Sequence, residues 1–113
     1  MPFISLKTNK TLTHLQEQNI KEIAGKLISI IPNKSEDYLM VHIYDQQVMY
    51  YQGNDQDCMM IEVKLYRSCD SSYKEDFTRQ LIKEVSMITN IPIDNIYLTI
   101  DEYQNWGLSG ELY

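Results

Sequence analysis

Apolar residues recur with two different periods along this chain, and segments with one period alternate with segments with the other. The segment 3–8 alternates apolar and polar side chains, which predicts a half-buried strand. After Thr13 the apolar residues recur at intervals of three and four, which predicts an amphipathic helix that ends near Pro32. Thr13 and Gln16 have the spacing of a capping box at the start of this helix.

A second strand is expected over 38–45, where tyrosine, valine and isoleucine are frequent. Behind it, the segment 48–52 is expected to form a short edge strand that turns at Gly53 and Asn54. The first half of the chain therefore reads as strand, helix, strand.

The second half repeats this order. A strand is expected over 60–66, and Ser72 with Glu75 has the spacing of another capping box. Pro92 ends the helix that follows, and a last strand is expected over 96–101. The apolar residues of this second helix form one stripe: Phe77, Leu81, Val85 and Ile88.

The element order predicts an α/β fold in one domain that spans residues 1–113. We interpret it as a duplicated βαβ unit, with pseudo-repeats at about 1–56 and 57–113. Such a unit gives a four-stranded sheet with two helices on one face, plus short edge strands. A ferredoxin-like binding domain has the same order of elements, so this order does not decide the function.

Composition restricts the class of protein further. The 113 residues are 43% hydrophobic and 23% charged, which is typical of one soluble domain with a single core. No segment approaches the roughly 18 to 20 apolar residues of a membrane span, and the start of the chain lacks the features of a secretion signal. We therefore expect no membrane contact and a cytoplasmic location. The net charge of −6 and the scattered basic residues argue against a nucleic-acid partner.

Histidine and cysteine give no indication of a metal site or another cofactor. Cys58 and Cys69 fit neither a zinc-ligand pair nor a redox pair, and we expect both to be small core residues. His14 and His42 lie apart from any cysteine or carboxylate cluster, and His42 is expected to be a hydrogen-bonded structural residue.

Pro2 is the strongest candidate for chemistry. If Met1 is removed, Pro2 carries a free secondary amine at the start of a strand. An exposed α-amino group titrates at about 7.7 to 8.0, and burial lowers its pKa, because a charged amine loses its hydration. Such an amine is a general base near neutral pH. The alternative is that Pro2 serves only to permit the removal of Met1.

The whole chain resembles the tautomerase superfamily, in particular the branch of macrophage migration inhibitory factor and D-dopachrome tautomerase. The resemblance depends on five short motifs that occur in the right order around the N-terminal proline. They are Met1-Pro2-Phe3-Ile4 with Thr8-Asn9, Asn33-Lys34 with Tyr38-x-Met40-Val41, Gln52-Gly53, Asp94-Asn95-Ile96-Tyr97, and Asn105-Trp106-Gly107-Leu108-Ser109-Gly110.

The resemblance implies a homotrimer whose sites lie at subunit interfaces and need no cofactor. It implies keto–enol tautomerisation of a small keto acid such as phenylpyruvate, with Pro2 as the catalytic base. Lys34 corresponds to the lysine of the family that binds the substrate carboxylate, and its charge would help to keep Pro2 neutral. Tyr97 corresponds to a pocket tyrosine that an adjacent subunit supplies.

Other substrate-binding positions follow from the same resemblance, and several depart from the pattern of the family. Tyr66 occupies a position whose backbone N–H contacts substrate, but the usual Ser-Ile-Gly is Leu-Tyr-Arg here. Thr99 replaces an asparagine, and the usual Gly-Trp-Asn is Gly-Leu-Ser here, with Trp106 directly before it. Phe3 completes the predicted set. These changes leave the preferred substrate open.

Two alternatives remain at this stage. Arg67 could hold a carboxylate, as arginines do in the dehalogenase and decarboxylase relatives of the superfamily. A trimer of this kind could also act as a protein ligand or scaffold without turnover, and the nine tyrosines of the chain suit an interaction surface.

Overall fold

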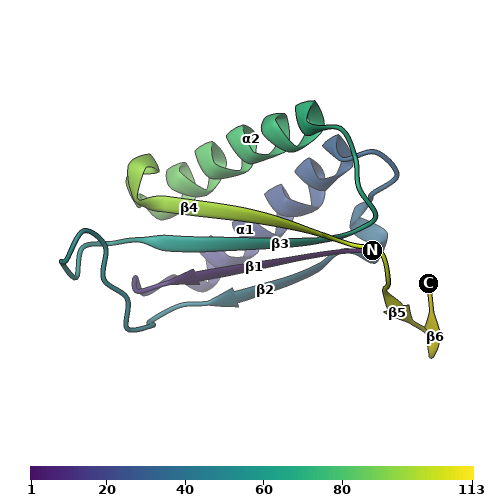
Figure 1. Cartoon of the computed structure of the whole chain (residues 1–113). Coiled ribbons are helices and arrows are strands. Elements are labelled where there is room, and N and C mark those ends of the chain that lie inside the picture. Colours follow the sequence, from purple (N-terminus) through teal and green to yellow (C-terminus); the bar gives the residue numbers. More distant parts are fainter.

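The computed structural model describes residues 1–113 and consists of a four-stranded sheet with two helices packed on one face (Figure 1). The sheet has the order β2-β1-β3-β4. Its strands are β1 (Pro2–Thr8), β2 (Met40–Tyr44), β3 (Met59–Tyr66) and β4 (Ile96–Tyr103), and its helices are α1 (His14–Leu27) and α2 (Ser71–Thr89). This architecture confirms the α/β prediction.

The order of the strands follows from the two strand–helix–strand units. β1 pairs with β2 in parallel, and β3 pairs with β4 in parallel, as strands joined by a helix do. The two units meet where β1 and β3 pair antiparallel, with Pro2 opposite Leu65. β1 is therefore central, and its first residue lies at the same end of the sheet as the end of β3.

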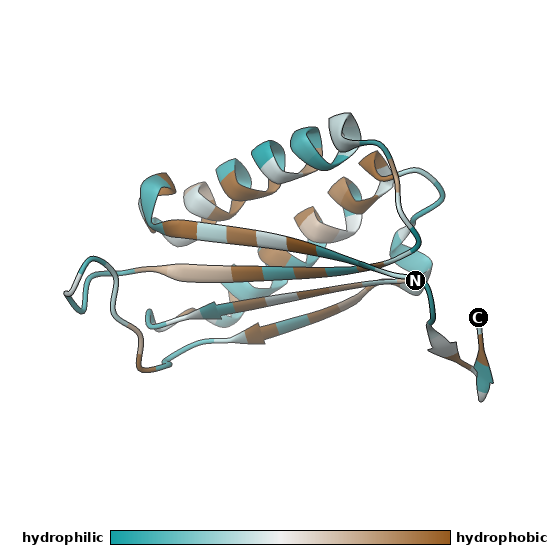
Figure 2. Cartoon of the chain, viewed as in Figure 1, coloured by the Kyte–Doolittle hydropathy of each residue, from teal (hydrophilic) through white to brown (hydrophobic).

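The core lies between the sheet and the helices. Every second residue of the central strands faces the helices and is fully buried, for example Ile4 and Val63. Figure 2 shows the brown, hydrophobic bands of the strands and helices. Of the predicted stripe on α2, Phe77, Leu81 and Val85 are fully buried, whereas Ile88 is only half-buried, and Thr89 takes the next buried position.

The opposite face of the sheet is not covered within one chain (Figure 1). Large apolar or aromatic side chains are exposed there, including Met40 at 65% and Tyr97 at 58%. Between them, Lys7 and Glu62 form an ion pair at 2.8 Å. Neither helix has the length and apolar character needed to cross a lipid bilayer.

Helix α1 begins as predicted. The Thr13 hydroxyl accepts from the backbone N–H of Gln16, and the Gln16 side chain accepts from the backbone N–H of Thr13. The helix ends at Leu27, earlier than predicted, and a 3-10 turn, η1 (Ile28–Ile30), leads to Pro32.

The predicted capping box of α2 is wrong. The helix begins at Ser71, so Ser72 already lies inside its first turn, and the cap position belongs to Asp70. No side chain caps this end. Ser72 and Glu75 have the right spacing but the wrong register, because the helix starts two residues earlier than a Ser72 cap requires.

The two helix starts give a matched stability test. We expect Thr13→Ala to lower the free energy of unfolding by about 1 kcal/mol, because it removes an N-cap hydrogen bond. Ser72→Ala removes no cap and should change that free energy by less than about 0.5 kcal/mol. Denaturant unfolding followed by circular dichroism measures both, and equal losses in the two variants would contradict this assignment of the caps.

The predicted edge strand over 48–52 is also wrong within a single chain. Only an isolated bridge forms, between Tyr51 and Asn54, around a tight turn at Gln52 and Gly53. Val48 is 88% exposed, so this segment has no neighbouring strand to pair with. A strand is stable only when its backbone groups find partners, and here the chain supplies only the bridge to Asn54 and side-chain donors such as Asn9 at the Met49 carbonyl.

Three short elements complete the chain. The 3-10 turn η2 (Glu36–Tyr38) delays the start of β2, which was expected at 38, and η3 (Ile93–Asn95) precedes β4. The C-terminal hairpin pairs β5 (Gly107–Leu108) with β6 (Glu111–Leu112) and projects away from the main sheet (Figure 1). It approaches the end of the sheet where the chain starts.

Candidate active site

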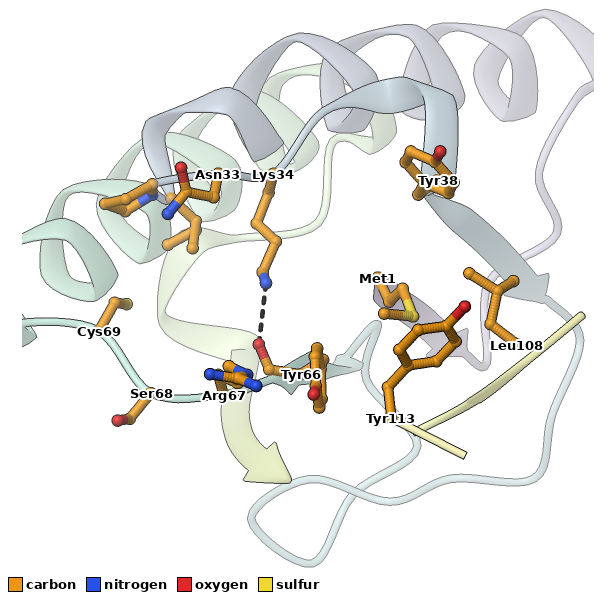
Figure 3. Close-up of a pocket in the computed structure, with 12 residues that line it drawn as sticks. Met1, Asn33, Lys34, Tyr38, Tyr66, Arg67, Ser68, Cys69, Leu108 and Tyr113 are labelled. Carbon is orange, nitrogen blue, oxygen red and sulfur yellow. Dashed lines mark hydrogen bonds between the residues drawn. The ribbon is translucent and has the colours of Figure 1, made fainter. Parts of the chain in front are cut away.

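The N-terminus of the chain opens into a cavity of about 500 Å³. We call it the Lys34 cavity. Three segments build it: the loop after η1, the loop after β3, and the C-terminal hairpin (Figure 3). Its lining residues are Met1, Ile31, Pro32, Asn33, Lys34, Tyr38, Tyr66, Arg67, Ser68, Cys69, Leu108 and Tyr113.

The amino group at the start of β1 lies in a setting that favours its neutral form. Burial lowers the pKa of the α-amino group of Met1 below its ordinary value of 8.0, and the positive charge of Lys34 lowers it further. Pro2 itself is buried. A Pro2 amine freed by the removal of Met1 would start one residue deeper, under the same two influences.

Lys34 reaches across the cavity from the loop after η1. Its ammonium group donates a hydrogen bond of 2.8 Å to the backbone carbonyl of Tyr66 (Figure 3). An ammonium has three N–H donors, so two remain for a ligand. Burial lowers the pKa of Lys34, and the nearby Arg67 charge acts in the same direction.

The residue before Lys34 is a further departure from the pattern of the resemblance, whose common Gly-Lys-Pro is Asn-Lys-Ser here. Asn33 has a φ of +64°, in the left-handed region that glycine adopts most easily. Asparagine is among the few other residues that adopt this conformation at low cost, because its short polar side chain bonds locally. Asn33 can therefore replace the usual glycine without moving Lys34.

The loop after β3 forms the wall of the cavity below Lys34. The backbone N–H of Arg67 donates to the carbonyl of Tyr103 at 2.7 Å. The backbone N–H of Cys69 donates to the Glu102 carboxylate at 2.9 Å, and Lys74 donates to the same carboxylate at 3.1 Å. Two contacts to β4 thus hold this loop in place.

Glu102 is kept ionised by these contacts. Burial alone would raise its pKa, but the donors from Cys69 and Lys74 outweigh that effect and lower it. The carboxylate is therefore hydrogen-bonded to Cys69 and Lys74, and it does not face the cavity as a free acid.

A second cavity of about 360 Å³ adjoins the first and shares Met1, Tyr38 and Leu108 with it. Pro2, Phe3 and Trp106 line this second cavity. Trp106 packs edge-on against Tyr103, with ring centroids 6.2 Å apart. The N-terminus thus lies between a wall that carries Lys34 and Arg67 and a wall that is largely apolar, in which Lys64 is the charged residue.

One chain does not bring Tyr97 and Thr99 to this place. Through the strand register, Tyr97 lies level with Lys7 and Thr99 with Ser5. Tyr97 is therefore five residues, or about 17 Å, along the sheet from Pro2. Both side chains are exposed on the uncovered face, where Tyr97 packs against Tyr51 at 5.5 Å. Their predicted role requires an adjacent subunit.

The sequence alone missed several lining residues. Tyr38 and Leu108 lie within motifs that carry the resemblance, but their roles were not assigned. Tyr113 reaches the cavity because its backbone pairs with that of Trp106. Cys69 was expected in the core, but it is half-buried in the cavity wall, whereas Cys58 is 4% exposed, as expected.

Other predicted residues have structural roles. The His42 ring lies 3.3 Å from the Ser5 hydroxyl, which confirms the expectation of a hydrogen-bonded histidine. Histidine, cysteine and acidic side chains nowhere form a group of three that could hold a metal ion.

The family model of macrophage migration inhibitory factor (MIF) matches residues 1–110 of the chain. The chain belongs to the MIF family. Its fold is that of the MIF tautomerases, and a four-stranded sheet with two helices is what the order of elements predicted. A comparison with curated proteins gives no significant match.

Solved structures of MIF-family proteins have the same fold. Leishmania major MIF2 superposes with a TM-score of 0.92 at 19% identity, over 100% of this chain and 97% of that one. The MIF homologue of Prochlorococcus marinus has a TM-score of 0.86 at 21% identity, with 97% of each chain covered. Pt0534, solved after inactivation by 2-oxo-3-pentynoate, has a TM-score of 0.86 at 13% identity, over 96% of this chain and 92% of that one. Identities this low establish the fold only.

Proposed function

We propose that this MIF-family protein is a keto–enol tautomerase for small 2-oxo acids, with the Pro2 amine as the general base after Met1 is removed. The observation that carries the proposal is the position of the N-terminus. It lies between the cavity with the Lys34 ammonium and the largely apolar cavity lined by Phe3 and Trp106. A base, a cation and an apolar wall are what a 2-oxo acid with a hydrophobic side chain requires.

The chemistry needs one proton to move. The neutral Pro2 nitrogen removes a proton from the carbon next to the substrate carbonyl, and the electrons of that C–H bond form a C=C bond. The carbonyl oxygen then becomes an enolate, which takes the proton back from the Pro2 ammonium and gives the enol, so that Pro2 is neutral again. Lys34 binds the substrate carboxylate with the donors that Tyr66 leaves free, and it holds the reacting carbon near Pro2.

We further propose that three chains assemble, as is typical of the family, and that a neighbour completes each site. The uncovered sheet face supports this, because it exposes large side chains such as Met40 and Tyr97. In such a trimer Tyr97 and Thr99 would reach the Pro2 cavity of an adjacent subunit. The segment around Val48 would find there the strand partner that it lacks in one chain.

We expect the pH dependence of kcat/KM to show that the pKa of the terminal amine is lowered. Protonated Pro2 cannot act as a base, so kcat/KM should rise with pH to a plateau as the amine loses its proton. Burial and then the charge of Lys34 lower the pKa of the terminal amine, so the midpoint should lie below the ordinary 8.0. Initial rates from pH 5 to 9 measure it. A midpoint at or above the ordinary value would contradict the proposed environment.

Tautomerisation of phenylpyruvate, followed by ultraviolet absorbance, tests the proposed function. The protein must first be shown by intact mass to lack Met1, because an amide nitrogen is not a base. Turnover above the buffer rate supports the proposal, and its absence in processed protein contradicts it. As a second probe, 2-oxo-3-pentynoate carries an alkyne conjugated to its ketone, to which an amine can add. We expect one adduct per chain, on the N-terminal peptide.

A further inference from the structure

We propose that the preferred substrate of this site is a dicarboxylic 2-oxo acid, and that Arg67 binds its second carboxylate. This inference rests on the proposed function, since it adds a distal subsite to the same cavity. The subsite is a polar hollow of about 390 Å³ that adjoins the Lys34 cavity. We call it the Arg67 hollow, and its lining residues are Arg67, Ser68 and Gln104.

Arg67 connects the two spaces, because it lines both of them. Figure 3 shows its guanidinium beside Tyr66, with Met1 and Tyr113 across the cavity. The Arg67 hollow has no apolar lining residue. Its guanidinium, hydroxyl and amide groups suit an anionic group rather than a hydrocarbon. A substrate whose first carboxylate meets Lys34 can therefore place a polar tail toward Arg67.

The Arg67 side chain has no partner of its own. It forms no ion pair, and no hydrogen bond from its guanidinium is present. Its only close contact of note is with the Tyr66 ring, 5.1 Å from the ring centroid. Stacking on an aromatic face holds a guanidinium but leaves its five N–H donors free. In this planar arrangement, the free donors can form two parallel hydrogen bonds with a carboxylate.

The charge around Arg67 favours an anionic ligand. The chain carries a net charge of −6, yet no aspartate or glutamate lines the Lys34 cavity or the Arg67 hollow. Glu102, on the strand behind this loop, accepts from the Cys69 backbone and from Lys74. Two unpaired cations in a wall of an acidic protein are stabilised when a dianion neutralises both.

The backbone holds Arg67 at this place. Its φ is +70°, in the left-handed region, and its N–H is tied to the Tyr103 carbonyl at 2.7 Å. A residue other than glycine costs roughly 1 kcal/mol or more in this conformation. The chain nevertheless has arginine here, where glycine would be less strained. The side chain, rather than the backbone, accounts for the choice of residue.

The test compares two substrates and two arginine variants. Rates of keto–enol conversion are measured for oxaloacetate, which has two carboxylates, and for phenylpyruvate, which has one. Arg67→Gln should lower kcat/KM for oxaloacetate roughly tenfold or more, because it removes a charge-assisted pair of hydrogen bonds. The ratio of kcat/KM for oxaloacetate to kcat/KM for phenylpyruvate should therefore fall roughly tenfold. Arg79→Gln is the control, since Arg79 is the only other arginine and is exposed on α2.

Binding measurements distinguish a failure of the Arg67 subsite from a failure of the proposed tautomerase function. Calorimetric titration with oxaloacetate and with phenylpyruvate is run on the wild type and on Arg67→Gln, both checked by circular dichroism. If no substrate turns over but oxaloacetate binds more tightly and loses that preference in Arg67→Gln, the Arg67 subsite is supported and the tautomerase proposal fails. If turnover is present but Arg67→Gln affects both acids equally or neither, the subsite is wrong and the tautomerase proposal remains.

Discussion

Pro2→Gly should reduce kcat/KM for phenylpyruvate by about 100-fold or more, because it disturbs the group that moves the proton. The pyrrolidine ring fixes the nitrogen at the start of β1, whereas a glycine amine rotates freely and is better hydrated. A base that is less well placed loses the benefit of proximity, which alone is worth several orders of magnitude in rate. Initial rates on variant and wild type, both shown by mass to lack Met1, measure the effect.

Pro92→Gly is the matched control for this substitution. Pro92 lies in the exposed turn before η3, far along the chain from the cavity, so its replacement should leave turnover within about twofold of the wild type. A Pro2→Gly protein with nearly normal turnover would show that another group is the base. The same variant separates an enzyme from a protein ligand, because affinity for a protein partner should not depend on the Pro2 nitrogen.

Lys34→Gln should lower kcat/KM for phenylpyruvate roughly 10- to 100-fold, mainly through a higher KM. The ammonium lines the cavity next to the N-terminus and points into it, where it donates to the Tyr66 carbonyl. A neutral amide keeps a donor but loses the attraction for a carboxylate. The pH midpoint of kcat/KM should also rise, because the charge that lowers the pKa of the terminal amine is gone.

Lys21→Gln is the control for the Lys34 variant, because Lys21 is exposed on α1 and has the same charge. It changes the net charge of the protein by the same amount without touching the cavity. Equal effects of the two substitutions would mean that Lys34 acts only through the general field of the protein. A lower KM in Lys34→Gln would contradict carboxylate binding directly.

The main elements of the fold could be predicted because their signals are local. Alternation of apolar residues marks β1 and β3, and the stripe from Phe77 marks α2. The cap of α1 was also visible, since both partners lie within four residues. The segment 48–52 could not be placed, because a strand depends on a distant partner. The start of α2 was missed for a similar reason: spacing alone does not fix the register of a cap.

The candidate site was predictable only in part. Pro2 and Lys34 were found because the motifs of the family mark them, and the structure places the chain start and Lys34 on one cavity. The shape of that cavity depends on contacts far apart in the sequence, such as Arg67 with Tyr103 and Trp106 with Tyr113. No local pattern in the sequence predicts such contacts. The role of Tyr97 remains a prediction, because it depends on a second chain.

The most direct test of Pro2 as the general base compares the wild-type protein with and without Met1. A preparation that retains Met1 is divided, one half is treated with a methionine aminopeptidase, and intact mass gives the fraction of chains that start at Pro2. We expect phenylpyruvate turnover to be absent before treatment and to rise in proportion to that fraction, because only then is the Pro2 nitrogen an amine. Turnover that does not change when Met1 is removed would contradict the proposal that Pro2 is the base.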